Sequence, residues 1–144
     1  MNSSKSIQER IVLDRFRQSY RDFPSGRIIK SESPDFLIRI SPKKSIGIEL
    51  TSLSKASYNI DSTSAGSFLQ DLTSSLIKKE EKLAIYQKNR ANEYWLVIYA
   101  DSIEVKGLES ENLLSGLNLN SGFDCIFLFE LFNGIVWKFQ QSRE

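Results

Sequence analysis

The chain contains no histidine and only one cysteine among its 144 residues. Without histidine, a Ser-His-Asp or Cys-His catalytic centre cannot be built, and neither can a zinc site with histidine ligands. The single cysteine, Cys125, excludes an internal disulfide and a thiolate metal cluster and is compatible with a reducing cytosol. It lies in an apolar run, which favours a buried core thiol over a nucleophile. Any catalysis must therefore depend on carboxylates, lysines and hydroxyls, with or without a cation that prefers oxygen ligands.

The chain also lacks an excess of either charge, because 19 lysines and arginines stand against 18 aspartates and glutamates, for a net charge of +1. This balance predicts neither a nucleic-acid nor an acidic partner, and a basic site would have to be local. No apolar stretch approaches the roughly 18 residues of a membrane-spanning helix, and the N-terminal residues do not resemble a secretory signal. We expect a cytoplasmic protein with a single domain over residues 1–144.

Hydrophobic periodicity predicts one helix over residues 4–22 and a longer one over about 67–90. In the first helix Leu13 and Phe16 lie at helical spacing, and Glu9 falls on the same stripe. The apolar stripe of the second helix consists of Leu69, Leu72, Leu76, Leu83 and Tyr86. The serine-rich residues 52–67 are expected to form a long loop, and residues 109–117 a short helix.

Alternating and continuous apolar runs predict the strands. They cover residues 27–30, 35–40, 45–51, 94–100, 123–131 and 135–139. The second and third are expected to pair as an antiparallel hairpin, and Asn133-Gly134 is a strong signal for another hairpin at the C-terminus. The strand at 94–100 is apolar on both faces, which is typical of a central strand. The order of elements predicts an α/β fold around a mixed central sheet.

Two carboxylates stand out in the predicted N-terminal hairpin. If Arg39 lies opposite Ser45, then Asp35 and Glu49 face each other with Cβ atoms roughly 4.5–5.5 Å apart. Glu49 points away from the apolar face of its strand, and Pro34 places Asp35 where a strand opens. Two carboxylates at that distance repel unless a positive group lies between them. Mg²⁺, which prefers one or two carboxylates with water and phosphate oxygens, is the expected occupant.

Lysines of the second helix could supply further charge to the same place. Lys79 interrupts the apolar stripe between Leu76 and Leu83, so it is expected to point where the helix meets the sheet. A buried lysine needs a partner, and the available partners are the two carboxylates. Simpler interpretations exist for each charged residue. Lys79 could extend to solvent, Lys82 could pair with Glu81, Glu9 could complete a capping box with Ser6, and Asp35 could cap a turn with Ser33.

The motifs Pro34-Asp35 and Glu49-Leu50-Thr51, with thirteen residues between Asp35 and Glu49, resemble those of the PD-(D/E)XK nuclease superfamily. Its restriction-endonuclease-like core has the order helix, three-strand meander, helix, strand, which matches residues 4–100; an extra C-terminal hairpin follows here. Thr51 stands where the family has a lysine. Some members, including small bacterial proteins of this fold, carry that lysine on the following helix, where this chain has Lys79 and Lys82.

The resemblance implies a Mg²⁺-dependent nuclease, with Mn²⁺ as a substitute, that hydrolyses phosphodiester bonds of DNA. The implied metal ligands are Asp35, Glu49 and the Leu50 carbonyl, and Glu9 would contribute through water. Lys79, or Lys82 as second choice, would orient the attacking water and stabilise the growing charge. If neither lysine reaches the site, the chain would be a catalytically inactive relative that binds nucleic acid or protein.

A DNA-binding surface would have to come from local basic residues. The candidates are Lys43 and Lys44 in the hairpin turn, and Lys78, Lys88 and Arg90 on the second helix. Such clusters can neutralise phosphates, although a solvated helix face explains them equally well. The small net charge argues against tight autonomous binding, so a homodimer or a recruiting protein would complete the surface. A partner protein with an unrelated α/β fold is a further alternative.

Overall fold

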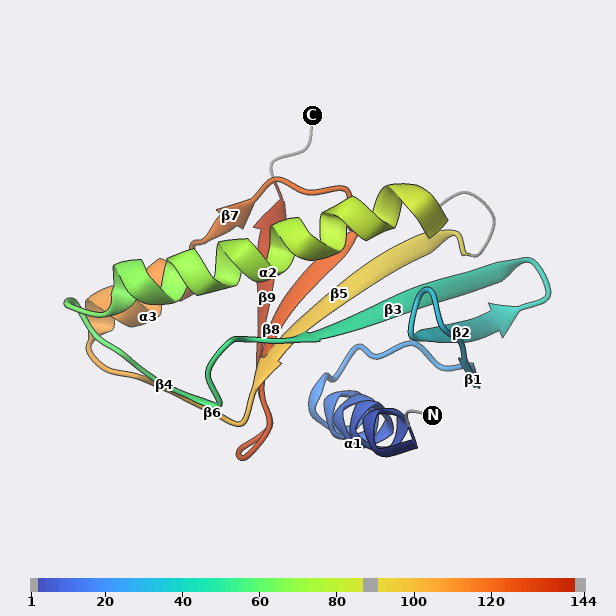
Figure 1. The fold of residues 1–144 in the computed structure, drawn as a ribbon, viewed down its shortest axis with the longest axis horizontal. Coiled ribbons are helices and arrows are strands. Elements are labelled where there is room, and N and C mark those ends of the chain that lie inside the picture. The colour runs from blue at the N-terminus through green and yellow to red at the C-terminus, as the bar shows by residue number, and fades with distance from the viewer. Residues whose placement is uncertain (1–2, 87–90, 142–144) are drawn as a thin grey trace.

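The computed structural model describes residues 3–86 and 91–141 (Figure 1). The helices in these ranges are α1 (Ser3–Ser19), α2 (Ala65–Tyr86) and α3 (Leu108–Ser115). The strands are β1 (Arg27–Lys30), β2 (Phe36–Ser41), β3 (Lys44–Ser52), β4 (Ser57–Ile60), β5 (Glu93–Ala100), β6 (Ser102–Val105), β7 (Asn118–Leu119), β8 (Cys125–Glu130) and β9 (Ile135–Gln141). None of the helices in the described ranges has the length and apolar composition that a membrane crossing requires.

The main sheet has the strand order β1-β2-β3-β5-β8-β9-β7. Strands β1, β2 and β3 form an antiparallel meander, and β8 and β9 form an antiparallel hairpin. The central strands β3, β5 and β8 pair in parallel, and α2 connects the first of these pairs. The predicted α/β fold with a mixed central sheet is therefore confirmed, as are the meander and the C-terminal hairpin with Asn133-Gly134 in its turn.

Helices α1 and α2 cover opposite faces of this sheet (Figure 1). Alternation along β3 explains why: Ile46, Ile48 and Leu50 pack with Leu13 and Phe16 of α1, while the residues between them face α2. Strand β5 is buried on both faces, as its continuous apolar run predicts. The predicted apolar stripes are buried or half-buried on both helices, apart from Tyr86, whose side chain lies outside the described part of the chain.

The predicted register of the first hairpin is confirmed, since Arg39 lies opposite Ser45. The last pair of the ladder is Phe36 with Ile48, so the direct cross-strand pair expected for the two carboxylates does not form. Pro34 has no amide hydrogen to donate, and the ladder therefore ends before it. Strand β3 nevertheless continues to pair with β5 as far as Ser52. From Glu49 onward, β3 has a neighbouring strand on one side only.

The expected loop over residues 52–67 is wrong in its middle and at its end. Residues 57–60 form β4, which pairs in parallel with β6 as a separate two-stranded sheet, and α2 already begins at Ala65. Tyr58 and Ile60 alternate with exposed residues and are buried, but their partner strand lies far along the chain. The predictions also omitted β6 and β7, and they extended the first helix three residues too far.

Gly47 allows the meander to pack closely at the start of the site. A Cβ atom there would lie 2.7 Å from Pro34 Cγ and 2.9 Å from the ring of Tyr94. We expect Gly47→Ala to lower the free energy of unfolding by about 1–3 kcal/mol, because the clash must be relieved by shifting packed groups. Gly66→Ala is the matched control, since a Cβ there meets nothing within 4 Å and alanine suits a helix. Urea unfolding of both variants measures the difference, and equal stabilities would contradict the expectation.

Candidate functional site

A cavity of about 340 Å³ lies beside the part of β3 that β2 leaves uncovered, between α1 and α2. It is lined by Lys5, Gln8, Glu9, Glu32, Ser33, Asp35, Glu49, Leu50, Thr51, Ser52, Lys79, Lys82 and Tyr99. All six residues predicted as catalytic or metal-binding are in this set. The structure thus brings together the carboxylates of three separate elements and both candidate lysines of α2. We call this space the central cavity.

Glu49 and Lys79 form a close ion pair in the central cavity, with Lys79 Nζ 2.8 Å from Glu49 Oε2. The side chains are only 6% and 15% exposed, respectively. Lys79 follows Leu76 by three residues and precedes Leu83 by four, so the packing of those two leucines against the sheet aims the lysine at β3. The simpler interpretation that Lys79 extends to solvent is therefore wrong. Glu49 Oε1 is buried and has no hydrogen-bond partner among the described residues.

Asp35 immediately precedes β2, and its Oδ2 atom accepts a hydrogen bond of 2.8 Å from the backbone amide of Leu50. This bond satisfies the Leu50 amide at a place where β3 no longer pairs with β2. Burial, and after it the negative charge of Glu49, raise the pKa of the Asp35 carboxyl from 3.8 to about 7. The Leu50 amide opposes this shift, since it favours the charged carboxylate. The simpler interpretation of a turn cap with Ser33 is wrong, because the carboxylate binds across to β3.

Glu9 is buried and forms an ion pair with Lys30, whose Nζ is 3.1 Å from Glu9 Oε1. The capping box with Ser6 is therefore wrong, because α1 begins at Ser3 and Glu9 lies well inside the helix. Lys30 also donates to the carbonyls of Ser31 and Asp35, at 3.0 and 3.5 Å, so it connects α1 to both ends of the β1–β2 turn. Sequence reasoning missed Lys30. The register of the meander places it opposite Phe36, and this was the signal that could have found it.

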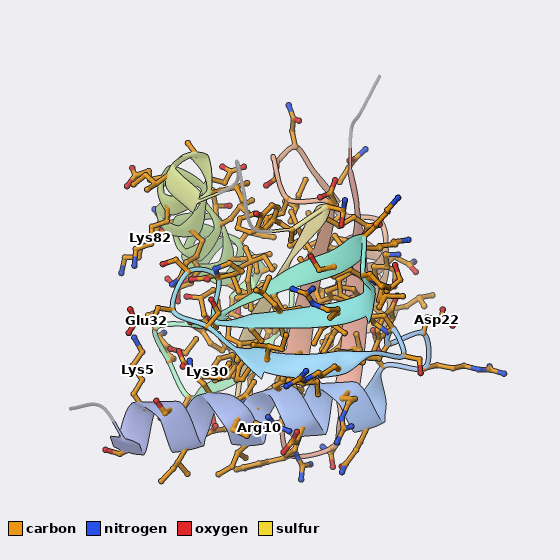
Figure 2. The ribbon with its side chains drawn as sticks, turned by 90° about the vertical axis from the view of Figure 1, so that its right-hand side faces the viewer. Lys5, Arg10, Asp22, Lys30, Glu32 and Lys82 are labelled. Atoms are coloured by element: carbon orange, nitrogen blue, oxygen red, sulfur yellow. The ribbon has the colours of Figure 1, made fainter. Side chains whose placement is uncertain are left out.

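Lys82 lies at the rim of the central cavity rather than at its base. Figure 2 shows Lys5 of α1, Glu32 and Lys82 of α2 on the same side of the molecule, away from Asp22. Lys82 is exposed, as its simpler interpretation has it, but among the described residues it forms no ion pair with Glu81. Of the two candidate lysines, Lys79 is the one that reaches the carboxylates.

Tyr99 of β5 is a further lining residue that the sequence reasoning missed. Its side chain packs in the core beneath α1 and is 8% exposed. Burial raises the pKa of its hydroxyl, and the carboxylates of Glu9 and Asp35 raise it further. The hydroxyl also bonds with Gln8. Tyr99 therefore stays protonated at neutral pH and offers a neutral hydroxyl to the acidic end of the cavity.

The residues predicted to bind nucleic acid lie in different places. Lys78 lines a cavity that adjoins the central one. Lys43 lies in the turn between β2 and β3, and Lys44 is the first residue of β3; this turn lies at one end of the molecule (Figure 1). Lys44 precedes Glu49 by five strand residues, so the turn is roughly 16 Å from the carboxylates. Lys88 and Arg90 lie outside the described residues.

The oxygen atoms around the central cavity suit a hard cation. The donor set contains carboxylates and hydroxyls, and the buried Oε1 of Glu49 is a donor that the described residues leave without a partner. Such ligands favour Mg²⁺ or Mn²⁺ over softer metals. Within residues 3–86 and 91–141, no three acidic or cysteine side chains lie close enough together to form a metal-binding cluster. A cation would therefore rest on Asp35 and Glu49, with water and phosphate as its other ligands.

Comparisons of the chain with protein families, curated proteins and solved structures found no match.

Proposed function

We propose that the protein is a metal-dependent nuclease that hydrolyses phosphodiester bonds of DNA, with a restriction-endonuclease-like core. The observation that carries this proposal is the convergence of Asp35, Glu49 and Lys79 in one cavity, with the ammonium 2.8 Å from the carboxylate of Glu49. The order of the elements from α1 to β5 and the motifs of β2 and β3 support the same assignment. Lys79 stands in for the lysine that Thr51 replaces.

The side chains have different roles in the proposed reaction, according to their charge and position. Asp35 and Glu49, together with the Leu50 carbonyl, would hold the cation, and Glu9 would reach it through water. Mg²⁺ lowers the pKa of bound water and offsets negative charge on a phosphate. The Lys79 ammonium, which is nearly buried, orients the attacking water and stabilises charge that grows on the phosphate oxygens. Lys82, at the rim, is placed to contact the phosphate as it enters.

A non-catalytic member of the same fold, which binds nucleic acid or protein, is the second candidate. One observation favours it: Lys79 already neutralises Glu49 at 2.8 Å, so this pair is complete without a cation. In that case the ion pair would be a purely structural link between α2 and β3. The two candidates differ in whether a divalent cation can compete with the lysine for Glu49.

Calorimetric titration of Mn²⁺ into the protein, with plasmid nicking in parallel, tests the proposal. We expect the wild type to bind the ion and nick DNA, and Glu49→Ala to lose both, because the carboxylate with the free oxygen is removed. Glu32→Ala is the matched control: it removes an equal charge from the rim of the same cavity and should change neither result. A wild type that binds DNA without Mn²⁺-dependent nicking would support the second candidate. Circular dichroism checks that the Glu49→Ala variant is folded.

A further inference from the structure

A second cavity, of about 330 Å³, adjoins the central cavity on the side of α2. Its hydroxyl and ammonium groups come from Thr51, Ser52, Ser54, Ser74, Ser75 and Lys78, and Asp71 completes the lining. Thr51 and Ser52 also line the central cavity, so the two cavities adjoin at the uncovered edge of β3, and we call the adjoining cavities the groove. We call this space the serine cavity. Nothing in the proposed reaction uses it.

Three donors of the serine cavity, those of Ser74, Ser75 and Lys78, are uncommitted, whereas the Ser54 hydroxyl is bonded to Asp71. Among the described residues, Lys78 forms no ion pair, and Ser74 and Ser75 make no side-chain hydrogen bond. An exposed ammonium beside several free hydroxyls matches the acceptor oxygens of a phosphate group. An anion could therefore accept hydrogen bonds from this ammonium and these hydroxyls without breaking existing contacts.

Asp71 is the one carboxylate in the lining, and its position limits its effect on an anion. Its Oδ2 atom accepts hydrogen bonds from the hydroxyls of Tyr58 and Ser54, at 2.8 and 3.0 Å. These bonds hold the carboxylate against β4 and partly satisfy its charge. Asp71 thus belongs to a contact between α2 and β4, and Lys78, seven residues further along α2, is the cation in the same lining.

A third cavity, of about 450 Å³, adjoins the central one on the side of α1, and it suits an anion less well. Three carboxylates line it, those of Glu9, Glu32 and Asp35, against the two lysines Lys5 and Lys30. Lys30 is already bonded to Glu9. The groove is therefore polarised, with its acidic end at α1 and its hydroxyl-rich end at α2.

We propose that the serine cavity binds the phosphate next to the scissile one, so that the substrate is a polynucleotide strand rather than an isolated phosphodiester. This inference rests on the proposed function of the central cavity. Ser75 and Lys79 are four residues apart on α2, about 6 Å along its axis, which is close to the spacing of neighbouring phosphates on a strand. One helix face thus presents donors to two successive phosphates.

Binding of a fluorescein-labelled single-stranded DNA oligonucleotide, measured by anisotropy in Ca²⁺ at several salt concentrations, tests the subsite without requiring turnover. We expect Lys78→Ala to weaken binding several-fold and to lower the slope of log K against log salt by about 0.7, because one phosphate contact is lost. The double variant Ser74→Ala/Ser75→Ala should weaken binding without a change in slope, since hydroxyls carry no charge. Lys138→Ala, which removes an exposed lysine from β9, is the control and should alter neither quantity.

Hydrolysis separates the subsite from the central site. Lys78→Ala should raise KM for the oligonucleotide while it leaves kcat/KM for thymidine 5′-(p-nitrophenyl) phosphate unchanged, since that substrate has one phosphodiester. An unchanged salt slope and KM in Lys78→Ala would overturn the subsite while the nuclease proposal stands. If the salt slope falls in Lys78→Ala as expected but the wild type cuts neither substrate, only the nuclease proposal would be overturned. A wild type that does not bind the oligonucleotide would overturn both.

Discussion

Replacing Lys79 with methionine is expected to lower kcat for DNA hydrolysis by about 10²- to 10³-fold, the range found when one electrostatic donor is removed from an active site. Methionine keeps most of the length of the side chain, so the packing of α2 on the sheet is retained. Affinity for Mn²⁺ should stay equal or increase, because the ammonium that occupies Glu49 Oε2 at 2.8 Å no longer competes with the ion. Single-turnover kinetics at saturating Mn²⁺, with calorimetry for the affinity, measure the two effects separately.

Lys82→Met is the matched comparison for this experiment. Lys82 lies on the same helix and lines the same cavity, but it is exposed at the rim, and we expect a loss of less than about tenfold. The reverse order of effects would assign the role to Lys82. Full activity of both variants would contradict a catalytic function for α2 and leave Asp35 and Glu49 to act without a lysine.

Replacing Asp35 with asparagine is expected to stabilise the folded protein at pH 8 in the absence of divalent ions, by about 2–4 kcal/mol. The pKa of Asp35 rises from 3.8 to about 7 on folding, chiefly through burial and then through the charge of Glu49. A raised pKa means that the folded state holds a proton that the unfolded state has lost. The contribution of Asp35 to the free energy of unfolding of the wild type is therefore largest below about pH 4, and it decreases as the pH rises to about 7. Asparagine has no charge, and its side-chain oxygen can still accept the Leu50 amide.

Urea unfolding at pH 4 and pH 8 measures this difference directly. The two proteins should have similar stabilities at pH 4 and differ at pH 8, and Mg²⁺ should narrow the gap at pH 8 because it binds only the folded wild type. Glu104→Gln, an exposed carboxylate on β6, is the control and should follow the wild type at both pH values. If Asp35→Asn is less stable than the wild type at pH 8, the carboxylate pair does not repel and the argument for a cation between them fails.

Local patterns in the sequence predicted much of the site. The alternation of β3 placed Glu49 on the face that turns toward α2, and the position of Lys79 between Leu76 and Leu83 aimed it at the same strand. Both inferences need only the two periodicities of strand and helix. The register of the first hairpin followed from its short turn, and it placed the two carboxylates near each other.

Contacts between distant segments could not be predicted in this way. The pairing of β4 with β6 joins residues on either side of α2 and β5, and nothing in the serine-rich sequence around Tyr58 indicates its partner. The bond from the Leu50 amide to Asp35 exists because the ladder stops at Phe36, which depends on how the chain turns before Pro34. Lys30 was missed for a related reason: its partner Glu9 is on a helix whose position over the sheet is set by the core.

The parallel pairing of β3 with β5 has a consequence for the order in which the protein folds. Ile46 lies beside Glu93, so this pair can form only after the whole intervening crossover has closed, and topologies of this kind fold slowly. Lys79 is part of that crossover, and its ammonium can pair with Glu49 only when the crossover packs against the sheet. A nascent chain released before β5 is in place would therefore carry its acidic residues without their lysine. The slowest step of assembly and the completion of the cavity are thus expected to be the same event.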